Sequence, residues 1–172
     1  MAEEVLDVVD EMDRVVGSAP RRDIHARGLR HRAVHILVFN GAGDVFLQKR
    51  SMAKDMHPGK WDSSASGHVD GGEEYAAAAA RELREELGVE ADPGELSELG
   101  RIEACAETER EFVRVYRVVR EGPFQINQAE ISEGRFESPS RVGAWISEAP
   151  SDFARAFLEV WKRFGCAGAV PA

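Results

Sequence analysis

The sequence predicts an α/β (α+β) fold in which a mixed β-sheet is packed between helices. Three observations support it: several apolar segments of strand length, one long run of strong helix formers, and an amphipathic segment near the C-terminus. Strands and helices do not alternate strictly, so a purely parallel sheet is not expected. The 172 residues favour one domain over 1–172, with a hairpin region at 1–32, a core at 33–164 and a flexible tail at 165–172.

The N-terminal half is predicted to consist mainly of strands. Residues 5–10 (VLDVVD) and 14–18 (RVVGS) flank a short polar segment and indicate a β-hairpin. The polar and basic segment 21–32 is either a loop or a short helix. Further along, the sequence predicts strands at 33–39 and 45–49 around the turn NGAGD, a long loop at 50–61, and a short strand within 62–68.

The strongest helix prediction covers residues 74–87. Five consecutive alanines precede RELREEL, all strong helix formers, and Gly88 ends the segment. Beyond it the sequence predicts strands at 96–103 and 111–120, a segment at 130–138 that includes an acidic loop, and a last strand at 142–146. A helix is predicted at 152–164, where apolar residues recur at helical spacing.

Charge and cysteine content restrict the classes of partner and compartment. The net charge of -9, from 31 acidic and 22 basic residues, argues against general binding to nucleic acid or anionic lipid. Two distant cysteines, Cys105 and Cys166, do not make a disulfide framework. The acidic N-terminus does not resemble a signal peptide, and no apolar stretch is long enough to cross a bilayer. We therefore expect a cytoplasmic protein without nucleic-acid or membrane partners, with a homodimer as one option.

The helix over 74–87 carries three acidic residues on one face. Glu82, Glu85 and Glu86 stand at helical spacings of three and four, where like charges repel. A shared divalent cation removes that repulsion, and carboxylate ligands favour Mg²⁺ or Mn²⁺. The alternative is a solvated acidic face neutralised by Arg81 and Arg84. The glycine-rich turn before the helix favours the metal site.

The whole segment 67–89, GHVDGGEEYAAAAARELREELGV, resembles the signature of the Nudix hydrolase family. The signature reads Gly, five residues, Glu, seven residues, Arg-Glu-apolar, one residue, Glu-Glu, one residue, Gly-apolar. Its fixed positions correspond here to Gly67, Glu73, Arg81, Glu82, Leu83, Glu85, Glu86, Gly88 and Val89. The chain is accordingly identified as a member of this family, and the resemblance implies a Nudix-like α/β/α sandwich. Weaker similarity to the branch that includes isopentenyl-diphosphate isomerase extends over most of residues 5–161.

The resemblance implies a role for each residue of the signature. Arg81 would hold Glu73 and fix the loop against the helix, and Glu85 or Glu86 would orient or deprotonate the attacking water. A later loop often supplies one more carboxylate in this family, for which Glu130 and Glu133 are candidates. The implied metal ligands are Glu82, Glu85, Glu86 and the carbonyl of Gly67.

The implied function is Mg²⁺-dependent (or Mn²⁺-dependent) hydrolysis of a diphosphate linkage in a nucleoside diphosphate derivative or similar compound. The metal neutralises phosphate oxygens and activates a water, and a glutamate accepts its proton. Among basic residues, Lys49, Arg50 and Lys54 could bind phosphate or be ordinary surface charge. Trp61 and Phe46 could stack on a base, although packing in the core is the stronger interpretation.

Similarity to the isomerase branch suggests a second metal site of His and carboxylate ligands. Its members would be His31, His68, Glu109 and Glu111, whereas His25 is displaced by one residue from another ligand position of that branch. A single His is more often hydrogen-bonded or exposed than a ligand, and His35 and His57 are interpreted in that way.

Two differences argue against isomerase activity. That branch uses a cysteine where this chain has Ser66, with Cys105 at no matching position, and its signature is degraded, whereas this one is intact. We predict a hydrolase; an isomerase-like enzyme and a non-catalytic nucleotide-binding module are the alternatives.

Overall fold

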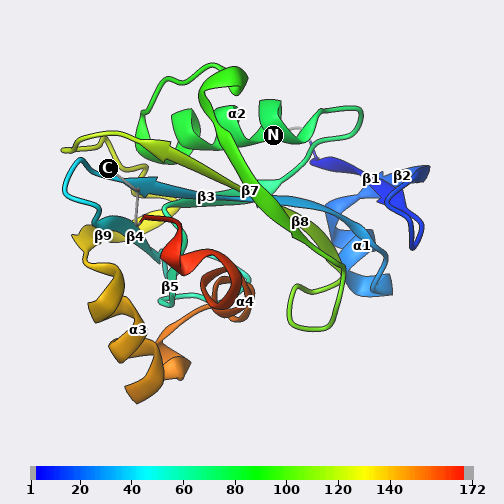
Figure 1. Cartoon of the computed structure of the whole chain (residues 1–172). Coiled ribbons are helices and arrows are strands. Elements are labelled where there is room, and N and C mark those ends of the chain that lie inside the picture. The colour runs from blue at the N-terminus through cyan, green and yellow to red at the C-terminus, as the bar shows by residue number, and fades with distance from the viewer. Residues whose placement is uncertain (1–2, 169–172) are drawn as a thin grey trace.

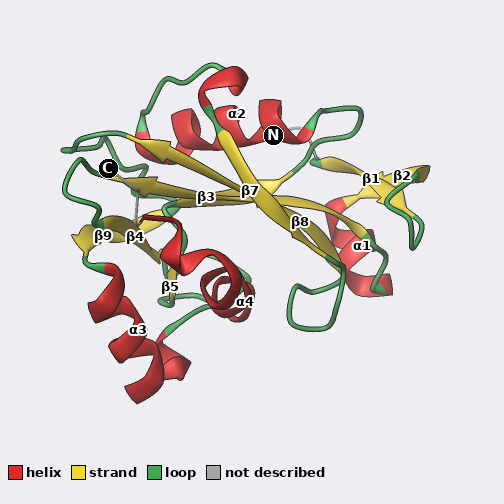
Figure 2. Cartoon of the chain, in the orientation of Figure 1, coloured by secondary structure: helices red, strands yellow, loops and turns green. Residues whose placement is uncertain are grey.

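In the computed structural model, which describes residues 3–168, a seven-stranded mixed sheet lies between helices on its two faces (Figure 1). Helix α2 (Tyr75–Leu87) covers one face, and α3 (Pro139–Glu148) and α4 (Arg155–Phe164) lie on the other, as the red ribbons of Figure 2 show. The predicted sandwich with a mixed sheet is confirmed. Within residues 3–168, every helix falls short of the length and apolar character that spanning a bilayer requires.

The strand order is β5-β4-β3-β8-β7, with β6 paired to β3 and β9 paired to β4. Only β3 and β8 run parallel; the other pairs are antiparallel. The strands are β3 (His31–Phe39), β4 (Val45–Arg50), β5 (Trp61–Asp62), β6 (Ala65–His68), β7 (Ser97–Ile102), β8 (Glu111–Val119) and β9 (Ile131–Glu137).

Strands β3 and β4 diverge from their hairpin, and this divergence creates room for a site. They pair only at Phe39 and Val45. Farther along, β6 takes the place of β4 beside β3. Ser64 links the diverging strands, because its hydroxyl accepts a hydrogen bond from Val38 N at 2.7 Å and donates one to the carbonyl of Phe46. Alternate residues of the strands face opposite sides, so Phe46 packs under α2 and Leu47 packs toward α4.

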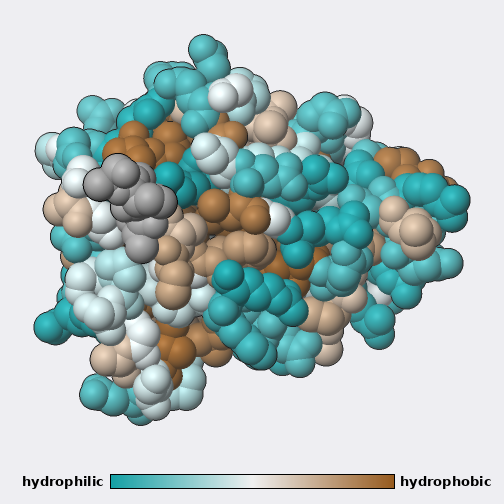
Figure 3. Space-filling view, viewed as in Figure 1, coloured by the Kyte–Doolittle hydropathy of each residue, from teal (hydrophilic) through white to brown (hydrophobic). Residues whose placement is uncertain are grey.

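The predicted N-terminal hairpin is confirmed as a separate two-stranded sheet of β1 (Val5–Val9) and β2 (Val15–Pro20). Asp13 in its turn anchors it, since it accepts hydrogen bonds from Arg32 Nε at 2.7 Å and from the Tyr75 hydroxyl at 2.9 Å. Brown, apolar residues gather at this end of the molecule in Figure 3, where Val15 and Val16 are exposed. The segment after the hairpin forms the short helix α1 (Arg21–Arg27), which ends at Gly28 with φ 61°.

Two predictions for the C-terminal third are wrong. The segment predicted as a last strand, 142–146, lies inside α3, where Pro139 occupies the first turn and Ser138 Oγ accepts a hydrogen bond from Arg141 N. This segment has only five residues, which is too short for the periodicity of its apolar residues to distinguish a strand from a helix. The acidic loop expected within 130–138 is a strand instead, because β9 occupies most of this segment and pairs with β4.

Smaller differences concern boundaries. The strand expected within 62–68 is split into β5 and β6 around Ser63 and Ser64. The last helix, α4, begins at Arg155, after the 3₁₀ turn η2 (Pro150–Asp152). A second 3₁₀ turn, η1 (Pro93–Glu95), precedes β7. In the tail expected to be flexible, η3 (Gly165–Gly168) is a 3₁₀ turn, and residues 169–172 lie outside the described part of the chain.

Candidate active site

A cavity of about 640 Å³ opens where β3 and β4 diverge, beside the C-terminal half of α2. Its size suits a small-molecule ligand. Three kinds of group line it: carboxylates of α2, a histidine-rich cluster, and basic side chains. Its ionisable lining residues include Arg21, His25, Arg50, Lys54, His68, Arg81, Glu82, Glu85, Glu86, Glu111 and Glu130.

Arg81 connects the turn before α2 to the carboxylates on the helix. Its Nε and Nη2 atoms donate to the two oxygens of Glu73, each at 3.0 Å. Nη1 donates to Glu82 at 2.6 Å and to Glu85 at 3.3 Å, and Nη2 also donates to the carbonyl of His68 at 2.9 Å. The geometry is the one that the signature implies for Arg81: a brace between loop, strand and helix.

The three helix carboxylates differ in burial. Glu82 and Glu86 are 9% and 4% exposed, whereas the side chain of Glu85 is 52% exposed. Gly67 on β6 packs directly against Glu82, and a Cβ at this position would lie 2.2 Å from its carboxyl carbon. Any larger residue at this position would therefore displace the Glu82 carboxylate from its present place.

Burial raises the pKa of Glu86 and of Glu82, and repulsion from a neighbouring carboxylate adds to it in both. Contact with Arg81 opposes the shift at Glu82. A cation bound between two buried carboxylates removes the electrostatic repulsion between their ionised forms. All-oxygen donors of this kind fit Mg²⁺ or Mn²⁺, so the residues present suit the metal that the family implies.

A second cluster joins His25 of α1, His31 of β3, His68 of β6 and Glu111 of β8. One ligand atom from each lies within 4.8 Å of all the others. Glu111 Oε1 is 3.4 Å from His31 Nε2 and 3.3 Å from His68 Nε2, which in turn is 3.3 Å from His25 Nε2. His31 Nε2 is buried without a hydrogen-bond partner, whereas its Nδ1 contacts the carbonyl of Leu29 at 2.9 Å.

The membership of this cluster differs from the prediction at two positions. Helix α1 turns His25 into it, which corrects the expected displacement of that residue. Glu109 lies outside it, because its carboxylate contacts His57 Nε2 at 2.7 Å. Both Glu109 and Arg110 have positive φ, and Glu109 lines the cavity beside the cluster rather than joining it.

Charges within the cluster are strongly coupled. Burial works against ionisation of Glu111, but the nearby imidazoles of His31 and His68 outweigh it and hold the pKa of Glu111 well below its usual range. Burial likewise opposes the charged form of His68, yet contacts with Glu111 and Glu4 raise its pKa to about 9. Three imidazoles and one carboxylate suit a borderline cation such as Zn²⁺ or Mn²⁺, which would replace the shared protons.

The three basic residues that were candidates for phosphate binding or for ordinary surface charge do not lie together. Arg50 and Lys54 line the cavity, Arg50 donating to Asp62 at 3.3 Å and Lys54 to Glu130. Lys49 points to the other face of the sheet, where its Nζ lies 5.9 Å from the centre of the Trp61 ring.

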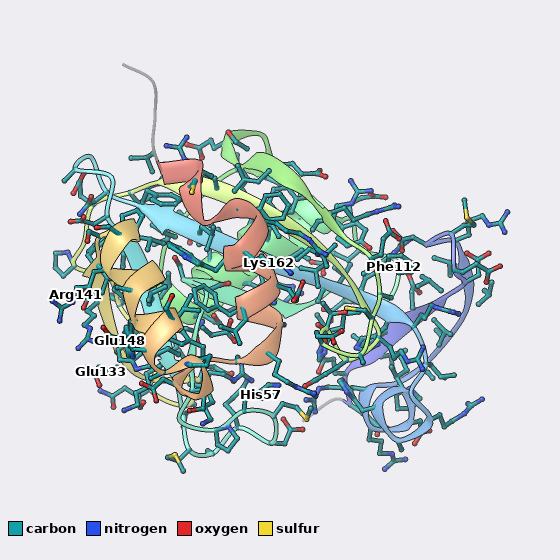
Figure 4. The ribbon with its side chains drawn as sticks, turned by 60° about the horizontal axis from the view of Figure 1, so that its bottom comes forward. His57, Phe112, Glu133, Arg141, Glu148 and Lys162 are labelled. Carbon is teal, nitrogen blue, oxygen red and sulfur yellow. The ribbon has the colours of Figure 1, made fainter. Side chains whose placement is uncertain are left out.

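Of the two late carboxylates, only Glu130 lines the cavity. Glu133 pairs in register with Lys49 and shares its face of the sheet. Figure 4 accordingly labels Glu133 on the α3 side of the molecule, with Arg141 and Glu148 of that helix. Trp61 and Phe46 pack in the two cores, as expected.

Sequence reasoning missed two residues in or beside the cavity, Arg21 and Gln48. Arg21 lines the cavity and donates to both oxygens of Asp55, at 2.8 and 3.0 Å. The sequence signal that could have identified Arg21 was its location in the basic segment 21–32. His35, interpreted from the sequence as a hydrogen-bonded or exposed residue rather than a ligand, is buried with its Nδ1 2.7 Å from Ser63 Oγ. The contact of Gln48 with Glu86, at 2.6 Å, had no signal in the sequence because the two residues are far apart along the chain.

The sandwich, with an acidic helix bordering its cavity, defines a known class of enzyme. The model of the NUDIX domain matches residues 29–157. The chain therefore belongs to the Nudix family, and it is a pyrophosphohydrolase of that family. Kinship with the isomerase branch stays a prediction.

Individual relatives agree with this assignment. The chain is 43% identical over 136 residues to the uncharacterized Nudix hydrolase PA4841 of Pseudomonas aeruginosa, covering 79% of each chain. It is 33% identical over 160 residues to the uncharacterized Nudix hydrolase YfcD of Escherichia coli K12, covering 93% of this chain and 87% of YfcD. The crystal structure of DR0079 from Deinococcus radiodurans superposes with a TM-score of 0.74 at 35% identity, covering 84% and 90% of the two chains.

Proposed function

We propose that the protein uses Mg²⁺ or Mn²⁺ to hydrolyse a diphosphate linkage in a nucleoside diphosphate derivative or a similar compound. The observation that carries this proposal is the pair of buried carboxylates, Glu82 and Glu86, which line the cavity, with Gly67 packed against Glu82. These two residues would hold the cation, with the Gly67 carbonyl as a further ligand. When bound, the cation neutralises phosphate oxygens and lowers the pKa of a coordinated water.

Side chains of the protein would supply the general base and hold the metal ligands in position. Glu85 is the better placed of the two proposed bases, because it borders the cavity and is half exposed, so it can take up the proton of the attacking water. Glu86 is buried and already accepts hydrogen bonds at Oε2. Arg81 keeps the carboxylates in place through its contacts with Glu73 and Glu82.

Substrate phosphate would be bound by basic side chains that line the cavity. Arg21, Arg50 and Lys54 line the same cavity as the carboxylates. Among the described lining residues none is Phe, Tyr or Trp, so the group attached to the diphosphate would be recognised by polar contacts rather than by stacking.

The second cluster would bind another divalent cation. We propose His25, His31, His68 and Glu111 as its ligands, on the basis of their converging ligand atoms and the unpartnered buried Nε2 of His31. Gly67 and His68 are adjacent in β6, so the two proposed sites lie on one strand of the same cavity.

The experiment is a screen of diphosphate compounds with Mg²⁺ and Mn²⁺, with E85Q and E82Q as matched variants. Metal-dependent release of monophosphate products by the native protein, lost in E82Q and strongly reduced in E85Q, is the expected result. Proton exchange into isopentenyl diphosphate without hydrolysis would instead support the isomerase alternative. Tight, metal-independent nucleotide binding without turnover would support a binding module.

A further inference from the structure

We propose that Gln48 is a positioning residue that leaves Glu86 a single oxygen, Oε1, for the cation. The inference rests on the metal site proposed above and adds a residue outside the Nudix signature. Gln48 lies on β4 and is 1% exposed. It reaches across the diverging strands to the last turn of α2, where Glu86 is located.

Two donors converge on the same oxygen of Glu86. Gln48 Nε2 donates to Glu86 Oε2 at 2.6 Å, and the backbone N–H of Ser66 donates to it at 3.2 Å. Among the described residues none donates to Oε1. Since a carboxylate oxygen with two donors has little capacity left for a cation, coordination would be monodentate through Oε1.

The orientation of the Gln48 amide is determined by its surroundings. Nε2 also donates to the carbonyl of Ser64 at 3.2 Å, and a carbonyl can only accept. The amide group is therefore turned with its N–H atoms toward Ser64 and Glu86. Ser64 is itself fixed by its hydroxyl, which joins Val38 of β3 to Phe46 of β4.

Packing alone does not explain why a glutamine occupies position 48, because this position of β4 faces an apolar core. Its neighbour on the same face, Phe46, belongs to the apolar core under α2. A buried amide among apolar side chains is unfavourable unless both partners are supplied, as Ser64 and Glu86 do here. The backbone carbonyl of Glu86 is separately held by Asn127 N at 2.8 Å, so Gln48 fixes specifically the side chain.

The test is Mn²⁺ binding, followed by the paramagnetic resonance of free Mn²⁺, in a His31→Ala background that is shared by all variants and removes one of the four proposed ligands of the second cluster. Q48M keeps the length of the side chain without its donor, and F46L is the matched control on the same face of β4. We expect Q48M to weaken Mn²⁺ binding by about 10- to 100-fold, the usual effect of losing a residue that orients a metal ligand. The KM for substrate at saturating Mn²⁺ should stay near the native value, and F46L should bind Mn²⁺ normally.

A folded Q48M with native Mn²⁺ affinity would overturn the role of Gln48. Should Q48M fail to fold, Q48N supplies the same measurement, because its shorter amide cannot span from Ser64 to Glu86. E86Q separates the two hypotheses: if it also binds Mn²⁺ normally, the metal site itself is wrong, whereas loss in E86Q with retention in Q48M refutes only the positioning role.

Discussion

The guanidinium of Arg81 meets both oxygens of Glu73 at 3.0 Å, eight residues before it in the chain. The contact closes the turn at residues 70–73 onto α2, since Glu73 Oε2 also accepts from Asp70 N at 3.0 Å. A two-point contact of this kind requires the planar fork of arginine. The same guanidinium reaches Glu82, so the geometry of the turn and the position of a proposed metal ligand depend on one side chain.

The first prediction concerns this brace. R81K keeps the charge but cannot hold Glu73 and Glu82 together, so kcat should fall on the order of 10- to 100-fold and the free energy of unfolding by about 2 kcal/mol. R84K, on the exposed face of the same helix, should change neither. Steady-state kinetics and urea denaturation measure both, and an R81K protein with native kcat would refute the brace.

The second prediction concerns the close approach at Gly67. In G67A the added Cβ would overlap the Glu82 carboxyl, which must move away from the cavity. Hydrolysis should drop by on the order of 100-fold, because displacing a ligand or catalytic group by a small distance has effects of that size. G143A in α3, where a Cβ meets nothing within 4 Å, is the control and should retain full activity. Equal activity of the two variants would contradict the argument.

The third prediction concerns pH. Burial raises the pKa of Glu82 and Glu86 in the folded protein above the ordinary 4.5, so the metal-free fold holds protons that the unfolded chain releases. Stability from these groups is complete below about pH 4.5 and is lost as pH rises through the folded pKa values. Mg²⁺ needs both groups ionised, so it should raise Tm more at about pH 8.5 than at about pH 6.

Thermal unfolding with and without Mg²⁺ at both pH values provides the measurement. E86Q, which cannot ionise at this position, should lose most of the difference between the two pH values. A Tm increase that is independent of pH in the native protein would speak against a metal held by these two carboxylates.

The fourth prediction compares two adjacent basic residues of β4. Arg50 lines the cavity, whereas Lys49 lies on the opposite face beside Trp61. R50Q should raise the KM for a diphosphate substrate about tenfold or more, the effect of losing a charged hydrogen bond to phosphate. K49Q should leave KM within about twofold, as expected for a surface substitution remote from the site. The reverse order of effects would place the phosphate elsewhere.

The sequence predicted the parts of the molecule whose signals are local. The helix expected over 74–87 matches α2, because most of its residues are strong helix formers such as alanine and glutamate. Gly88, with φ 66°, ends it. The contact between Arg81 and Glu73 was implied by the resemblance of the same segment to the Nudix signature. The hairpin β1–β2 could likewise be predicted from two apolar runs around a turn.

The parts that were missed depend on partners distant in the chain. Strand β9 is an acidic segment that becomes a strand because β4 offers it an unpaired edge. His25 enters the second cluster through the rotation of a short helix, and Glu109 lines the cavity beside the cluster. The period of two along β4 places Lys49 and Arg50 on opposite faces, which could have been inferred once the strand was predicted.

The most direct measurement is anomalous diffraction from crystals of the protein with Mn²⁺ and a non-hydrolysable diphosphate analogue. We predict a Mn²⁺ peak bonded at about 2.2 Å to carboxylate oxygens of Glu82 and Glu86, with phosphate oxygens completing its coordination. Peaks confined to other places, with Glu82 and Glu86 making no contact with metal or analogue, would contradict the account.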